Sequence, residues 1–99
     1  MSDTATATAT KQKIKLPSQW KAVMLNDDYT PIDFVVSVLQ QVFEKSEQEA
    51  QQLTQAIHNH GRAVVLVASL EVVRQKVEDT MKLAASYHFD AFKVIKEQA

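Results

Sequence analysis

The sequence of 99 residues contains no cysteine and only one glycine, Gly61. Without cysteine the chain forms no disulfide, no thiolate metal site and no cysteine nucleophile, and this composition is compatible with a reducing cytoplasm. One glycine excludes the usual glycine-rich loops that cradle phosphates. The 11 basic and 12 acidic residues nearly balance, so the sequence offers no basic face for a nucleic acid.

Long apolar segments are also missing. No run approaches the roughly 18 apolar residues of a membrane helix, and the first residues include no apolar signal core. We therefore expect a cytoplasmic protein with neither a membrane nor a nucleic acid as partner. The hydrophobic content of 45% is enough for the core of one small domain.

The first 17 residues differ in composition from the rest of the chain. They alternate Ala and Thr over 5–10 and then become rich in lysine. Such a segment buries too little apolar surface to offset the entropy lost on ordering. We predict a flexible N-terminal extension over 1–17 and a folded domain over 18–99.

The apolar periodicity of the domain predicts an α+β fold. A three-stranded antiparallel sheet, with three helices packed on one face, follows the order β-α-α-β-α-β. The continuous apolar run 63–67 is typical of a central strand that is buried on both faces. Gly61 suits the left-handed position that ends a helix. The expected elements are strands over 20–25, 63–67 and 89–95, and helices over 31–43, 46–60 and 70–87.

Polar residues that suit helix N-termini precede the first two predicted helices. Thr30 suits the N-cap of the first helix, with Pro31 at the first helical position and Asp33 as the capping-box acid. Ser46 and Glu49 have the spacing of a second capping box. Both helices should therefore begin at defined residues.

The stretch Asn26-Asp27-Asp28 lies between the first predicted strand and the first predicted helix. Held there, its polar side chains could recognise a positive group or one with several donors. Equally, Asn and Asp are common turn residues, and local turn structure is the default role of Asp28. His58 is the best candidate partner, although a histidine near the end of a helix also suits the helix dipole.

Neither metal binding nor catalysis has a recognisable motif. No two histidines stand four residues apart, and Asp27, Asp28, His58 and His60 show no metal-ligand pattern. No serine lies in a nucleophile elbow. We expect no metal, no cofactor and no catalytic residue; an acid-base enzyme would have support only from Asp27 and His58.

Two motifs resemble the ClpS family, the adaptors that deliver N-degron substrates to the AAA+ Clp protease. The first is W-K-A-V-M-L-N-D-D-Y-T-P over 20–31, and the second is A-I-H-N-H-G-R-A-V over 56–64. The resemblance covers about residues 17–96. It implies a non-enzymatic adaptor that binds the free α-amino group of substrates beginning with Leu, Phe, Tyr or Trp.

The resemblance also implies roles for individual residues. Asn26 would orient the first residue of the substrate, Asp27 would accept from its ammonium group, and His58 would complete the cage. An ammonium carries three donors and no acceptor, which suits these three side chains. The first side chain would enter an apolar pocket lined by Ile32, Val35, Thr54 and Ile57.

A second surface would contact the ATPase. By resemblance, Tyr29, Glu71 and Lys76 dock on the N-terminal domain of a Clp AAA+ ATPase of the ClpA or ClpC type, which also engages the N-terminal extension. The alternative is a diverged ClpS-like paralog that docks on the ATPase and modulates it without recognising N-degrons.

Several departures from the family pattern fall near the pocket. Thr54 and Ile32 stand where many relatives carry Met, and further departures are Leu66, Ala68, Arg74 and Asp90-Ala91. Long, flexible Met side chains make a pocket adaptable, so we predict a narrower choice of first residues than the family accepts. The Thr54 hydroxyl also needs a hydrogen-bond partner.

Overall fold

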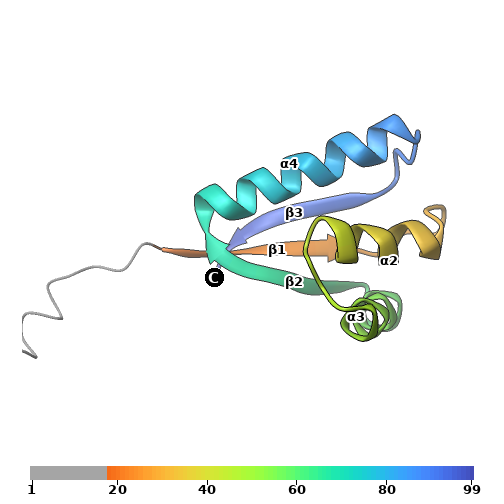
Figure 1. The fold of residues 1–99 in the computed structure, drawn as a ribbon, viewed down its shortest axis with the longest axis horizontal. Helices are drawn as coiled ribbons and strands as arrows, with labels where there is room; N and C mark the ends of the chain where they lie inside the picture. The colour runs from red at the N-terminus through yellow and green to blue at the C-terminus, as the bar shows by residue number, and fades with distance from the viewer. Residues whose placement is uncertain (1–17) are drawn as a thin grey trace, which may run out of the picture.

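The computed structural model describes residues 18–99 (Figure 1). The predicted order of elements is confirmed, whereas the extension predicted over 1–17 lies outside the described residues. Within 18–99, no helix is both long and apolar enough to cross a membrane. The elements are β1 (Gln19–Leu25), α2 (Ile32–Gln41), α3 (Glu47–His60), β2 (Arg62–Ser69), α4 (Leu70–Ser86) and β3 (Lys93–Gln98).

The central strand of the sheet is β1. The strand order is β2-β1-β3, and both pairings are antiparallel. The expectation of a central strand over 63–67 is therefore wrong, because β2 forms an edge, and Val64 and Val67 are 41% and 53% exposed. The register shifts between Ala22 and Val23, so Val65 is an extra residue that turns into the core beside Leu66. The bulge thus places two consecutive apolar residues, Val65 and Leu66, on the core side, whereas Val64 and Val67 stay exposed.

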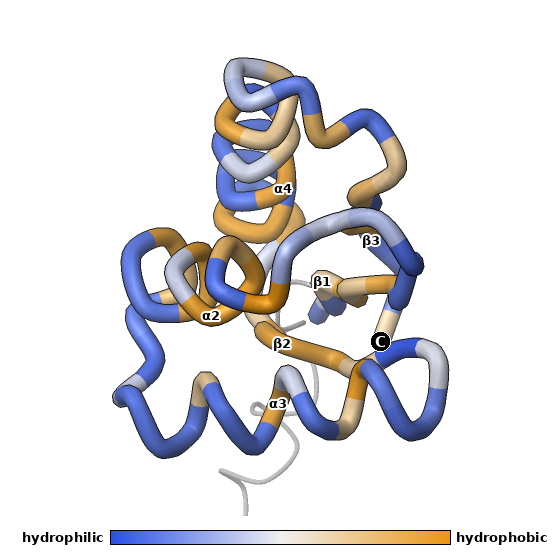
Figure 2. Tube along the Cα trace, turned by 90° about the vertical axis from the view of Figure 1, so that its right-hand side faces the viewer, coloured by the Kyte–Doolittle hydropathy of each residue, from blue (hydrophilic) through white to orange (hydrophobic). Residues whose placement is uncertain are grey.

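The three helices lie on one face of the sheet, as predicted, with α3 toward its β2 edge (Figures 1 and 2). The core forms between this face and the helices. Among its largest fully buried side chains, the helices contribute Leu39, Val38 and Val73. Phe92 comes from the segment before β3, and Met24 comes from β1. Phe34 and Val35, near the start of α2, pack against this core.

The two predicted N-caps have different outcomes. At α3 the capping box is confirmed: Glu49 N–H donates to Ser46 Oγ at 3.1 Å, and Ser46 N–H donates to Glu49 Oε1 at 3.2 Å. At α2 the N-cap is Pro31 and no side chain caps the helix. The expected roles of Thr30 and Asp33 are therefore wrong, because the Thr30 hydroxyl donates to Asp27 instead.

The last strand begins later than predicted. Phe89 to Phe92 form a turn, in which Phe92 N–H donates to the Phe89 carbonyl at 3.2 Å, and β3 starts at Lys93. Both phenylalanine rings pack edge-on against Phe34 of α2, with centroids 4.8 and 5.5 Å away. Because these aromatic contacts favour the turn, strand alternation does not extend back to Phe89.

Candidate functional site

The loop between β1 and α2 is held by the carboxylate of Asp27. Its Oδ1 accepts from Tyr29 N–H at 2.8 Å and from Thr30 N–H at 2.7 Å, and its Oδ2 accepts from the Thr30 hydroxyl at 2.8 Å. Asp28, for which turn structure was the default role, is exposed and makes no side-chain hydrogen bond within 18–99. The turn role therefore belongs to Asp27.

The same contacts determine the charge of Asp27. Partial burial by itself would raise the pKa of this carboxyl, but the bonds from the Thr30 amide, the Tyr29 amide and the Thr30 hydroxyl together hold its pKa below the ordinary value. Asp27 is therefore ionised at neutral pH. Its Oδ1 has both lone pairs occupied, while Oδ2 has room for one further donor.

A main-chain hydrogen bond joins this loop to the end of α3. Asn26 N–H donates to the Gly61 carbonyl at 2.9 Å. Gly61 ends α3 in the left-handed conformation, with φ 86°, and its own N–H donates to Ile57. His58 lies in the last turn of that helix, so the bond brings the Asn26 loop and His58 to the same place.

Asn26, Asp27 and His58 line one pocket of about 210 Å³. Ile57 and Phe92 are buried beneath it, whereas Ile32 is 63% exposed and lies at its mouth. All four residues expected to form the apolar lining contribute to it, namely Ile32, Val35, Thr54 and Ile57. The volume is below the 300–1,000 Å³ of sites for drug-sized ligands.

Sequence reasoning gave no site role to four residues of this lining: Leu25, Asp28, Thr30 and Phe92. Leu25 directly precedes Asn26 in the first motif, and that adjacency was a usable signal. Phe92 was assigned to a strand, so only the observed turn before β3 shows that it lies under the pocket.

The hydroxyl of Thr54, in the pocket wall, is already hydrogen-bonded within the protein. Its Oγ1 donates to the Ala50 carbonyl one helical turn earlier, at 2.8 Å. The partner that this hydroxyl was expected to need is therefore supplied by its own helix. The hydrogen of this hydroxyl is not available to a ligand.

The three residues expected to contact an ATPase do not form a single patch. Glu71 and Lys76 line a shallow hollow of about 300 Å³ on α4. Lys76 Nζ donates to the Val42 carbonyl just beyond α2, at 2.8 Å. Tyr29, 84% exposed, precedes α2, and a ten-residue helix is about 15 Å long. A partner touching all three must span α2.

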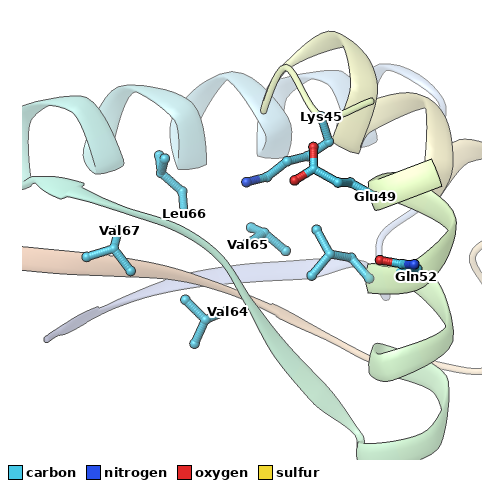
Figure 3. A pocket seen from close by; sticks show the side chains of 8 residues that line it. Lys45, Glu49, Gln52, Val64, Val65, Leu66 and Val67 are labelled. Carbon is cyan, nitrogen blue, oxygen red and sulfur yellow. The ribbon is translucent and has the colours of Figure 1, made fainter. Parts of the chain in front are cut away.

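A further hollow of about 350 Å³ lies between β2 and the beginning of α3 (Figure 3). Lys45 and Glu49 border it above the segment 64–67. It shares no lining residue with the pocket of Asn26. In the part of the chain that the structure describes, no three His, Asp or Glu side chains gather to hold a metal ion.

The pocket combines an ionised carboxylate, an amide and an imidazole with an apolar interior. Such a set suits an ammonium group that carries an apolar substituent. Fold and pocket together define a small binding domain of the α+β class.

Comparison with known proteins identifies the family. The family model described as ATP-dependent Clp protease adaptor protein ClpS matches residues 15–93, and the chain belongs to the ClpS family. The Clp protease adapter ClpS of Leptospira biflexa is 47% identical over 75% of this chain and 66% of its own length. The ClpS 1 protein of Rhizobium meliloti is 39% identical over 85% of this chain and 72% of its own length.

A solved structure has the same fold. Agrobacterium tumefaciens ClpS2, determined with L-phenylalaninamide bound, superposes with a TM-score of 0.81 at 32% identity. The match covers 85% of this chain and 100% of the ClpS2 chain. The fold predicted from the sequence is thereby confirmed by an independent relative.

Proposed function

We propose that this protein is an adaptor that binds the free α-amino group and the bulky apolar first residue of N-degron substrates and delivers them to a Clp ATPase. The observation that carries the proposal is the open pocket in which Asn26, Asp27 and His58 surround an apolar interior. Binding of L-phenylalaninamide by Agrobacterium ClpS2 supports it, because that compound has a free amino group on an aromatic residue.

Asp27 is the electrostatic centre of this recognition. Its Oδ2 accepts one donor from the ammonium group of the substrate, and the Asn26 side-chain carbonyl and the His58 imidazole accept others. Each charge-assisted bond contributes about 1.5–3 kcal/mol. An internal peptide bond has neither the charge nor the three donors, so the site rejects it.

The apolar interior selects the first side chain. Ile57 and Phe92 are buried under the pocket, and Thr54 presents no free hydroxyl hydrogen to the ligand. A pocket of about 210 Å³ without a flexible Met accepts only part of the set Leu, Phe, Tyr and Trp. The protein performs no catalytic step in this scheme.

Docking on the N-terminal domain of a ClpA- or ClpC-type ATPase uses Tyr29 before α2 together with Glu71 and Lys76 on α4, so that the partner spans α2. A paralog that docks without binding N-degrons would have no need of an open pocket. The open pocket therefore supports the adaptor over that alternative.

Fluorescence anisotropy with a labelled peptide that begins with Phe tests the proposal. The expected result is saturable binding that N-acetylation of the same peptide abolishes. Asp27→Ala and His58→Ala should each weaken binding. Equal binding of the free and the acetylated peptide, or no binding of either, would contradict the proposal.

A further inference from the structure

The two edge strands of the sheet differ in charge. Within six residues β3 carries Lys93, Lys96 and Glu97, and charged side chains on an edge discourage other strands from pairing with it. β2 carries a charge only at its first residue, Arg62, and the segment 63–69 has none. Within residues 18–99, β2 pairs only with β1, so its outer edge lacks the protection that β3 has.

The side chains of β2 alternate between the core and the open face of the sheet except at the bulge. Val64 and Val67 lie opposite β1 residues that alternate with its core residues, and both are exposed. Val65 and Leu66 turn into the core. An unprotected edge thus carries an apolar segment, 64–67, with two exposed valines.

This segment matches a second copy of itself. Two β2 strands can pair antiparallel about a two-fold axis between Val65 and Leu66. Val64 of one copy then lies opposite Val67 of the other, and Val65 of one copy lies opposite Leu66 of the other. Each pair joins residues of the same face, as directly opposed residues in a sheet require. The two bulges also face each other, so neither strand leaves a residue unmatched.

The charges beside the segment are self-complementary as well. Lys45 and Glu49 border the hollow above 64–67 (Figure 3). Within residues 18–99 neither forms an ion pair. A two-fold axis reverses the order of these two residues in the second copy. Lys45 of each copy therefore lies toward Glu49 of the other, and opposite charges meet on both sides of the axis.

We propose that this protein associates with a second copy of itself through the outer edge of β2, so that two three-stranded sheets join into one. The inference goes beyond the proposed function and does not depend on it. The hollow beside β2 shares no lining residue with the pocket of Asn26 or with the hollow of Glu71 and Lys76. Each copy in the dimer consequently keeps its own pocket and its own α4 surface.

Sedimentation equilibrium of the full chain tests the dimer. A pairing centred on four residues of each strand is a small interface, and small interfaces give weak association. The mass should rise from 11.1 kDa toward twice that value as the concentration increases from about 1 to 200 µM. A mass that stays at one chain over the whole range overturns the inference.

One variant and a matched control locate the interface. Val67→Lys places a charge in the middle of the edge and should weaken association about tenfold or more. Val72→Lys alters a valine of similar exposure on α4 and should leave association unchanged. Association that tolerates Val67→Lys, or that is lost equally in both variants, contradicts an interface at β2.

Two charge reversals test the two-fold arrangement. Lys45→Glu and Glu49→Lys each bring like charges together across the axis, so each protein alone should associate about threefold to tenfold more weakly. Mixed in equal amounts, the two proteins should associate with each other at least as tightly as the unaltered protein does with itself. In 1 M salt, where the Debye length is about 3 Å, these differences should largely vanish. Circular dichroism checks that α3 survives the loss of Glu49 from its capping box.

The outcomes separate this inference from the proposed function. A mixture that associates no better than either charge-reversed protein alone overturns the two-fold pairing. The labelled peptide that begins with Phe should bind Val67→Lys and the unaltered protein equally. A failure of the adaptor proposal would therefore appear in the peptide assay, and a failure of the dimer would appear in sedimentation.

Discussion

The main-chain N–H of Asn26 donates to the Gly61 carbonyl at 2.9 Å and thereby connects the end of β1 with the end of α3. Asn26 and Asp27 lie on one side of this bond, and His58 lies in the helical turn that Gly61 ends. The two polar sides of the pocket are therefore placed by main-chain atoms. A change at His58 should therefore weaken binding without displacing this frame, whereas a change at Asp27 also removes the hydrogen bonds that hold the loop.

Gly61 is the weak point of that frame. With φ 86° it is left-handed, and no heavy atom lies within 4 Å of the position that a Cβ would occupy. Gly61→Ala should therefore lower the free energy of unfolding through backbone strain alone, by about 1–2 kcal/mol. In urea denaturation Gly61→Asn should lower the free energy of unfolding less than Gly61→Ala does, because Asn tolerates the left-handed conformation better. Equal losses for Ala and Asn would show that strain is not the cause.

Asp27 should make stability depend on pH. Its pKa is lower in the folded protein than in the unfolded chain, where it is about 3.9. Its stabilising contribution is therefore fully present above the unfolded pKa and is lost as the pH falls through the folded value. Urea titrations measure this contribution as the difference in free energy of unfolding between the unaltered protein and Asp27→Asn. The difference should be largest at pH 7 and should shrink as the pH falls below the unfolded pKa.

The buried hydroxyl of Thr80 should destabilise the folded protein. It is fully buried, and its hydroxyl has no partner among the described residues. Thr80→Val keeps the shape and removes the unpaired group, so the free energy of unfolding should rise by about 1 kcal/mol. Thr54→Val is the comparison, since that hydroxyl donates to Ala50 and its loss should bring no such gain. Thermal unfolding of both variants tests this prediction: the melting temperature should rise for Thr80→Val and should not rise for Thr54→Val.

Lys76 should have two separable roles. Its Nζ donates to the Val42 carbonyl at 2.8 Å and pairs with Glu44 at 3.1 Å. Lys76→Met should therefore lower the free energy of unfolding by about 1 kcal/mol as well as weaken capture of the ATPase N-terminal domain. Glu71→Gln should weaken capture alone, because Glu71 is exposed and pairs only with Arg74 within 18–99. Unchanged capture by both variants would remove α4 from the docking surface.

The pocket should discriminate among first residues. Peptides that begin with Leu, Phe, Tyr and Trp should differ in affinity by tenfold or more, about 1.4 kcal/mol, because Ile32 and Thr54 adapt less than Met. Thr54→Met and Ile32→Met should narrow these differences. Equal affinities of the unaltered protein for all four peptides would contradict the prediction.

Local patterns predicted the fold well wherever one residue type determines a conformation. Ser46 with Glu49 and the left-handed Gly61 mark the two ends of α3; the first was predicted from its spacing and the second from the missing Cβ of glycine. The roles of the cage residues Asn26, Asp27 and His58, and the lining of the apolar pocket, were predicted from the resemblance to the ClpS family. Periodicity alone left their purpose open, since Asn and Asp also form ordinary turns.

Other features depend on contacts between distant residues and could not be predicted locally. Val65 and Leu66 both face the core because of a register shift between Ala22 and Val23, which depends on the pairing of β1 with β2. Thr30 does not cap α2, because its hydroxyl donates to Asp27 instead. Phe89 lies in a turn rather than in a strand, and its ring packs on Phe34. In each case a tertiary or competing hydrogen-bond contact overrides the local signal.

The bond from Asn26 to Gly61 also has a kinetic meaning. It closes a loop that contains all of α2 and α3, and closure of a long loop is entropically unfavourable until the contacts that reward it exist. Neither helix can bring His58 to the loop on its own. The ability to recognise a ligand should therefore arise only after this long-range closure, so that a partly folded chain is unable to capture a substrate.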